Sequence, residues 1–169
     1  MNLPDQLLKY HQHQGQTNDC APFTTAMVIN AVRDEKQLDG VELAKEMNWP
    51  RARWWGPIPI PVVRRIPNWA TFPWGVADVL KAHAVPCRWR FGAATGDLHR
   101  ALADGRVAMP IIGEWKPVWA HIKPLAAYQP PHGFAFADPA NASPGLVWQN
   151  EADFLRLWKN YGNLLIETL

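Results

Sequence analysis

The sequence has little of what marks exported or membrane proteins. Only two cysteines, Cys20 and Cys87, occur in 169 residues, so the framework of a disulfide-stabilised secreted protein is absent and we expect two free thiols. No stretch approaches about 18 consecutive apolar residues, which argues against a transmembrane helix. The first ten residues have no basic segment followed by an apolar one, so no secretory signal is expected. We therefore expect a soluble, cytoplasmic protein without a membrane partner.

A strong overall charge is also missing. The net charge is +2, from 17 basic and 15 acidic residues, which gives no reason to expect nucleic acid as a partner. Between residues 51 and 106 there are nine basic and three acidic residues. This local excess of positive charge is compatible with binding of an acidic ligand, but a solvent-exposed charged face is the favoured interpretation.

What the sequence does contain is an ordinary globular balance, with 48% hydrophobic and 19% charged residues. The length suits one domain over residues 1–169 with a single core. Ten tryptophans and 16 prolines are unusual, and many of them fall between residues 48 and 75. There Pro57, Pro59 and Pro61 remove alternate backbone donors, which excludes a central strand and predicts an irregular insertion.

The order of predicted elements indicates the fold class. A helix begins near Cys20–Pro22, with an apolar stripe at Phe23, Met27, Val28 and Ala31, and a second covers 41–47 with Asp39 as its N-cap. Later helices are predicted near 75–84, 96–103 and 151–159, and strands near 85–91, 107–112, 118–127, 133–137, 146–148 and 164–168. Helices first and strands later predict an α+β fold, with N-terminal helices on one side of a largely antiparallel sheet from the C-terminal half.

Cys20 is the first candidate for chemistry. At the start of a helix, unpaired N–H groups and the helix dipole favour a thiolate. Gln14 lies six residues upstream and can offer its side-chain amide to an oxyanion beside the Cys20 N–H; Gln12 and Gln16 compete for that role. A lone cysteine is more often a small buried residue, so the rest of the sequence has to decide.

His121 and Asp138 are the candidate partners. Trp119, His121 and Lys123 share one face of a predicted strand, and Asp138 ends the next strand in an Asp-Pro pair. Each also suits a purely structural role, as a solvent-facing histidine or a turn aspartate. If the two strands are neighbours, the carboxylate can accept a hydrogen bond from the imidazole and fix its tautomer, as a catalytic triad requires.

The ordered combination resembles a known family. Gln14 to Cys20 is similar to the Gln-x5-Cys opening of papain-like cysteine peptidases, and Asp19-Cys20 with the following helix resembles the C39 and C39-like branch, which includes bacteriocin-leader processing domains. Ala120-His121 and Asp138-Pro139 match that branch in order and approximate spacing, and residues 151–165 resemble its late helix and final strand. Two departures are Ala21, where the family usually has Gly, and the Trp/Pro-rich stretch, which has no counterpart.

The resemblance implies a bacterial, papain-like peptidase whose nucleophile begins the first core helix. It assigns Cys20 as nucleophile, His121 as general base and acid, Asp138 as orienting residue and Gln14 as oxyanion donor. We expect a monomer that binds a peptide or protein substrate, with Trp54, Trp55 and Trp119 as substrate contacts.

Neither a cofactor nor a metal is expected, since His11 and His13 lack a complete set of ligands. Two alternatives keep the same scaffold. An acyl-enzyme at Cys20 can also be resolved by an amine, so that the same site would work as an acyltransferase or a deamidase. A catalytically silent scaffold could instead bind peptide or glycan through its aromatic segment.

Overall fold

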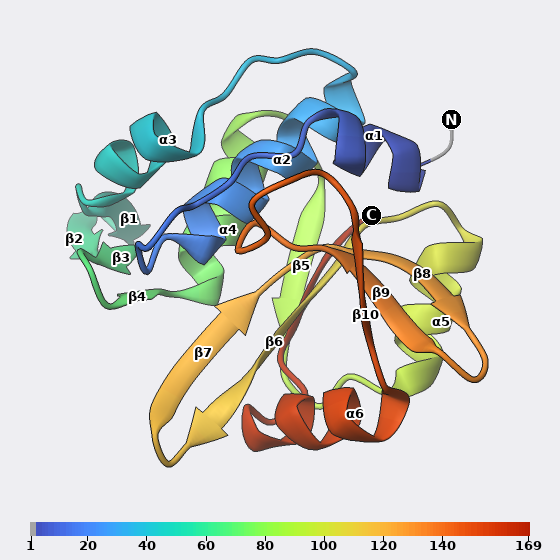
Figure 1. Ribbon diagram of the computed structural model, residues 1–169. Helices are drawn as coiled ribbons and strands as arrows, with labels where there is room; N and C mark the ends of the chain where they lie inside the picture. Colours follow the sequence, from blue (N-terminus) through green and yellow to red (C-terminus); the bar gives the residue numbers. More distant parts are fainter. Residues whose placement is uncertain (1–2) are drawn as a thin grey trace.

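The computed structural model describes residues 3–169 and contains six helices and eleven strands within them (Figure 1). The helices are α1 (Leu3–Lys9), α2 (Cys20–Arg33), α3 (Gly40–Met47), α4 (Pro73–Ala82), α5 (Thr95–Ala103) and α6 (Glu151–Asn160). The strands are β1 (Arg51–Trp55), β2 (Ile58–Val62), β3 (Arg65–Ile66), β4 (Ala70–Thr71), β5 (Cys87–Arg90), β6 (Ala108–Trp115), β7 (Val118–Ile122), β8 (Leu125–Gln129), β9 (Gly133–Ala137), β10 (Leu146–Gln149) and β11 (Leu165–Thr168). Among these residues, no helix combines the length and apolar character needed to cross a membrane.

The strands pair only in antiparallel fashion within the described residues. One sheet has the order β5-β11-β6-β7 and another the order β10-β9-β8, while β1-β2 and β3-β4 form two small separate sheets. The predicted mixture of helices and antiparallel strands is therefore confirmed. The single sheet is a simplification, because the predicted strand 118–127 is divided after Ile122. Pro124 lacks a backbone donor, and the chain leaves one sheet there to enter the other.

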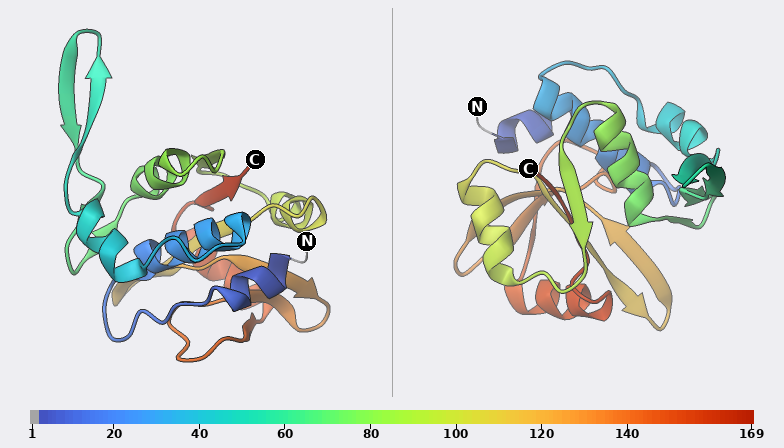
Figure 2. Two further views of the ribbon diagram at one scale, coloured as in Figure 1. Left: turned by 90° about the horizontal axis from the view of Figure 1, so that it is seen from above. Right: turned by 180° about the vertical axis from the view of Figure 1, so that it is seen from behind.

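Helices cover both sides of the strands, which corrects the prediction that they pack on one side only. Figures 1 and 2 show α1, α2, α3 and α4 on one side and α5 and α6 on the other. Two buried clusters correspond to this division. One joins α2 and α4 to Met109, Ile111 and Ile166, and the other joins α5 and α6 to Ala108, Ile112 and Leu165. Because successive strand residues point to opposite faces, β6 and β11 contribute to both clusters.

The Trp/Pro-rich stretch is more regular than its sequence predicts. Residues 51–62 form the β1-β2 hairpin, closed by Gly56 at φ 60° and Pro57, and Figure 2 shows it projecting from the body. In an antiparallel pair, only every second residue bonds to the partner strand. Pro59 and Pro61, opposite Trp54 and Ala52, can therefore keep the positions that face away. The predicted irregularity was wrong for residues 51–62, because prolines exclude a central strand but permit an edge strand.

The basic excess between residues 51 and 106 is partly neutralised inside the fold. Glu167 on β11 is 1% exposed and forms ion pairs with three arginines of that stretch. The Glu167 carboxylate lies 2.9 Å from Arg88, 3.2 Å from Arg90 and 2.7 Å from Arg106. These arginines therefore serve a buried structural carboxylate.

Candidate active site

Cys20 is the first residue of α2, as the sequence predicts. The preceding residue, Asp19, occupies the N-cap position but makes no capping hydrogen bond with its side chain. Its carboxylate pairs instead with the buried guanidinium of Arg65. The first N–H groups of a helix have no acceptor within the helix, so the N–H groups of Cys20 and Ala21 remain at the mouth of α2. Ala21 is 4% exposed and belongs to the core under the helix.

The helix that carries Cys20 is attached directly to the strand that carries His121. The Thr24 hydroxyl, one turn beyond Cys20, donates a 3.0 Å hydrogen bond to the carbonyl of Ile122. On the other side, the Tyr161 hydroxyl donates to the carbonyl of Trp119 at 2.9 Å. Gly113 makes room for this contact, since a Cβ there would lie 2.0 Å from the same carbonyl oxygen. The backbone on both sides of His121 is therefore fixed.

His121 lies between Cys20 and Asp138. Its Nε2–H donates to Asp138 Oδ1 at 2.7 Å, and the ring also interacts with the Cys20 side chain. Burial disfavours the charged imidazolium, but the interactions with Asp138 and Cys20 outweigh this effect and raise the pKa of His121 to about 9. At neutral pH the ring is therefore protonated, and the imidazolium lies beside the Cys20 side chain.

Asp138 is placed by the end of β9. The strand β9 is buried along its whole length, and the Ala137 N–H donates to the Pro124 carbonyl at 3.1 Å, which brings the end of β9 beside the end of β7. Asp138 Oδ1 also accepts from the Ala140 N–H at 2.9 Å. Burial opposes ionisation of Asp138, yet the hydrogen bond from His121 and the positive charges of His121 and Lys123 lower its pKa to about 2.

Gln14 is tied to the same corner of the molecule. Its backbone N–H donates to the Pro139 carbonyl at 2.9 Å, so it lies beside the segment that follows Asp138. Its side-chain amide donates to the Thr17 carbonyl at 2.8 Å, which uses one of two N–H groups and leaves the other. The competing Gln12 has a structural role, since its side chain bonds to the Leu38 carbonyl and to the Gly40 N–H.

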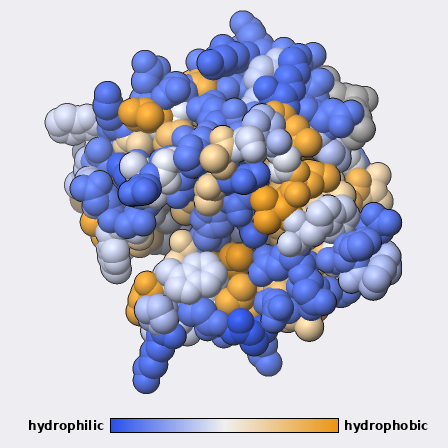
Figure 3. All heavy atoms as spheres, viewed as in Figure 1, coloured by the Kyte–Doolittle hydropathy of each residue, from blue (hydrophilic) through white to orange (hydrophobic). Residues whose placement is uncertain are grey.

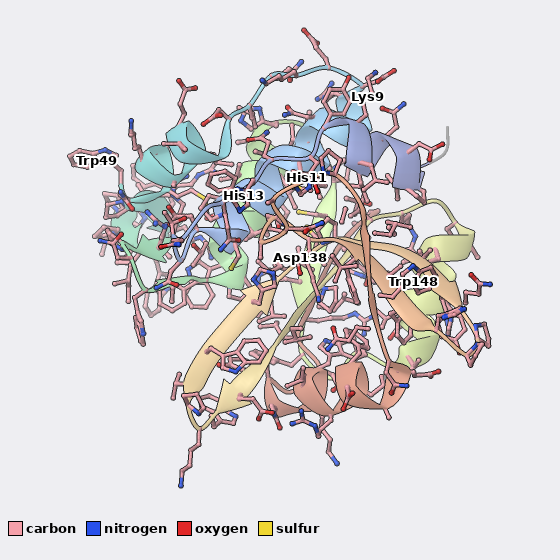
Figure 4. All side chains as sticks on the ribbon, in the orientation of Figure 1. Lys9, His11, His13, Trp49, Asp138 and Trp148 are labelled. Atoms are coloured by element: carbon pink, nitrogen blue, oxygen red, sulfur yellow. The ribbon has the colours of Figure 1, made fainter. Side chains whose placement is uncertain are left out.

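The three tryptophans predicted to contact substrate lie in different places. Trp119 precedes His121 by two residues on the same strand and is 39% exposed. Trp54 and Trp55 lie on the projecting hairpin, where they are 72% and 79% exposed. Figure 4 shows Asp138 near the middle of the face and Trp49, at the base of the hairpin, directed outward from its edge. Trp119 is thus close to His121 in the chain, whereas Trp54 and Trp55 are exposed to solvent on the hairpin.

The structure adds two residues that the sequence did not assign to the site. Lys123 is buried with its Nζ 3.5 Å from Asp138 Oδ2, and the strand alternation that placed it on the same face as His121 was a usable signal. Arg65 reaches Asp19 from 46 residues away, and nothing in the pattern of its irregular segment indicated this. His11, considered as a metal ligand, hydrogen bonds through Nε2 with the Asn141 carbonyl at 2.9 Å.

The face seen in Figure 1 has no continuous apolar surface. In the space-filling view of Figure 3, hydrophilic residues predominate and hydrophobic ones appear in separate patches.

Comparisons with known proteins agree with this geometry at the level of the fold. Neither a protein-family model nor a curated protein matches the sequence. Among solved structures, one from Bacillus anthracis, itself provisionally described as a C39-like peptidase, superposes with a TM-score of 0.70 and 13% sequence identity. The match covers 94% of this chain and 93% of that one. The fold of this chain is therefore similar to that of a C39-like peptidase.

Proposed function

We propose that this protein is a papain-like cysteine peptidase that hydrolyses a peptide or related amide bond through Cys20. The observation that supports it most is the position of His121, which hydrogen bonds with Asp138 at 2.7 Å and interacts with the Cys20 side chain. A nucleophile, a base and a group that orients the base are the parts that covalent acyl transfer requires. The similarity to a C39-like peptidase fold and the order of the three residues support the same proposal.

In the proposed reaction, the Cys20 thiolate forms a C–S bond with the substrate carbonyl carbon. The Cys20 N–H and the second Gln14 amide N–H donate to the resulting oxyanion. Protonated His121 gives its proton to the leaving amine as the C–N bond breaks. Neutral His121 then takes a proton from water, hydroxide adds to the acyl-enzyme, and the thiolate leaves. Asp138 holds the imidazole throughout.

The substrate contacts belong to the same proposal. Trp119 lies next to His121 along β7 and would contact the residues beside the cleaved bond. Trp54 and Trp55 would act further away, as an arm for a peptide or protein substrate, and the protein would work as a monomer.

A peptide library tests this function. Wild-type protein is incubated with proteome-derived peptides and new termini are identified by mass spectrometry, with C20A as the inactive variant and C87A as the matched cysteine control. We expect new termini with wild type and C87A and none with C20A. Products joined to an added amine such as glycinamide would point to acyl transfer, conversion of Gln to Glu to deamidation, and no change in any sample to a silent scaffold.

A further inference from the structure

Lys123 is a buried cation whose nearest charged neighbour is Asp138. It follows β7 directly, and its side chain is 7% exposed. Its Nζ lies 3.5 Å from Asp138 Oδ2 and 4.4 Å from the centroid of the Phe136 ring. A buried ammonium is costly unless it is paired, and burial lowers the pKa of Lys123 while Asp138 opposes that change. The carboxylate and the ring therefore compensate this charge together.

The contacts of Asp138 are divided between its two oxygens. Oδ1 accepts from the His121 Nε2–H and from the Ala140 N–H, whereas Oδ2 faces the Lys123 ammonium. A carboxylate held at both oxygens cannot rotate away from the imidazole without losing one of these partners. In the described part of the chain, the charged side chains that face Asp138 are His121 and Lys123, and α2 contributes Cys20, which faces His121.

We infer that Lys123 is a positioning residue of the Cys20 site, which holds the second oxygen of Asp138 so that the first oxygen keeps receiving the His121 Nε2–H. With Cys20 as thiolate and His121 as imidazolium, the four neighbouring charges of Cys20, His121, Asp138 and Lys123 sum to zero. Without Lys123, the buried site would carry a net negative charge, which disfavours the thiolate. The part of this inference that concerns Cys20 reactivity rests on the proposed function.

The first test is the pH profile of Cys20 alkylation by iodoacetamide in K123M, K123Q and K123R. Methionine keeps the length without charge, glutamine keeps a donor without charge, and arginine keeps the cation. In K123M and K123Q, we expect the part of the profile in which the alkylation rate rises with pH to move up by about half a pH unit, with labelling about threefold slower at pH 6. K123R should keep the wild-type profile. K159M, which removes an exposed lysine on α6, is the matched control and should match wild type.

A residue that only fills space would give a different result. K123M, whose side chain fills the same space, would then keep the wild-type pH profile of Cys20 alkylation, and this outcome would overturn the inference.

The second test does not depend on Cys20 being reactive. The His121 Nε2–H proton, shielded by Asp138, should give a downfield NMR signal with slow solvent exchange in protein labelled with ¹⁵N-histidine, and D138N should remove it. We expect the His121 Nε2–H proton to exchange with solvent at least about tenfold faster in K123M, which corresponds to the free energy of about one hydrogen bond. In K123R its exchange should stay slow. Equal exchange in wild type and K123M refutes the role of Lys123. Inert Cys20 in wild type refutes the proposed function instead, and the exchange rates still decide on Lys123.

Discussion

The two cysteines lie in opposite environments. Cys87 on β5 is 4% exposed, its thiol contacts the Ala77 carbonyl at 3.5 Å, and burial raises its pKa. Cys20 is partly exposed, at a helix start and in contact with His121. A buried thiol in apolar surroundings is inert, whereas one beside an imidazolium at a helix start is nucleophilic. The ratio of their alkylation rates is therefore a direct readout of the site.

Removal of His121 should have the largest effect on that ratio. If His121 assists Cys20 as proposed, H121A should slow the labelling of Cys20 by iodoacetamide at pH 6 about 100-fold, toward that of an ordinary thiol. Cys87 should not change and serves as the internal control. Mass spectrometry of both cysteine peptides measures the two rates, and an unchanged ratio would mean that His121 does not assist Cys20.

Substitution of Asp138 should have the next largest effect, mainly at alkaline pH. Burial lowers the pKa of His121, but Asp138 and Cys20 together raise it to about 9, so loss of the carboxylate in D138N should lower that pKa by about 1–3 units. The imidazolium would then lose its proton nearer neutral pH. In wild type, protonated His121 contributes to the free energy of unfolding below pH 6.5, and this contribution is lost as the pH rises through about 9. In D138N it would be lost at a lower pH.

NMR titration of the His121 ring measures its pKa directly, as the pH at which half of the rings are protonated. H121A should abolish the stability change between pH 6.5 and 9, and a midpoint that is equal in D138N and wild type would contradict the role of Asp138.

Loss of Arg65 should have a smaller effect on the ratio of Cys20 to Cys87 alkylation rates and a clear effect on the free energy of unfolding. Arg65 is buried and pairs with Asp19, the residue that precedes Cys20. In R65M, a partly buried carboxylate is left next to Cys20, which should disfavour the thiolate and slow Cys20 labelling about threefold. Breaking a buried pair also costs roughly 3–5 kcal/mol of folding free energy. Urea unfolding measures this loss, with R53M, which breaks a more exposed pair with Asp78, as the milder comparison.

The smallest effect is expected for the hairpin. The double variant W54A/W55A should leave the ratio of Cys20 to Cys87 labelling within about twofold of wild type, because both side chains are exposed and lie outside the charge cluster. Its effect should appear as a higher KM for a peptide found in the library screen, with kcat retained. A change in the alkylation ratio would show that the hairpin reaches the nucleophile.

The sequence predicted the parts of the fold that depend on local patterns. The helix after Cys20, the capped helix after Asp39 and the strand before Asp138 were all recognisable, and Asp39 indeed accepts from the Val41 N–H at 2.8 Å. The hairpin was missed because alternate prolines remove donors only from the outer edge of β2, a distinction that needs the partner strand.

Long-range pairing was beyond local reasoning. The contact between His121 and Asp138 depends on the chain leaving one sheet at Pro124 and returning along the next, and spacing alone does not determine which strands end side by side. Lys123 could have been found, because it shares a face with His121. Arg65 could not, because its partner lies 46 residues away and no periodicity links the two.

The most direct test of the central claim is selective alkylation of the wild-type protein at pH 6 with a limiting amount of iodoacetamide, followed by mass spectrometry of both cysteine peptides. We expect Cys20 to be labelled on the order of 100 times faster than Cys87, as for a thiolate compared with a buried thiol. Equal and slow labelling of the two cysteines would contradict it.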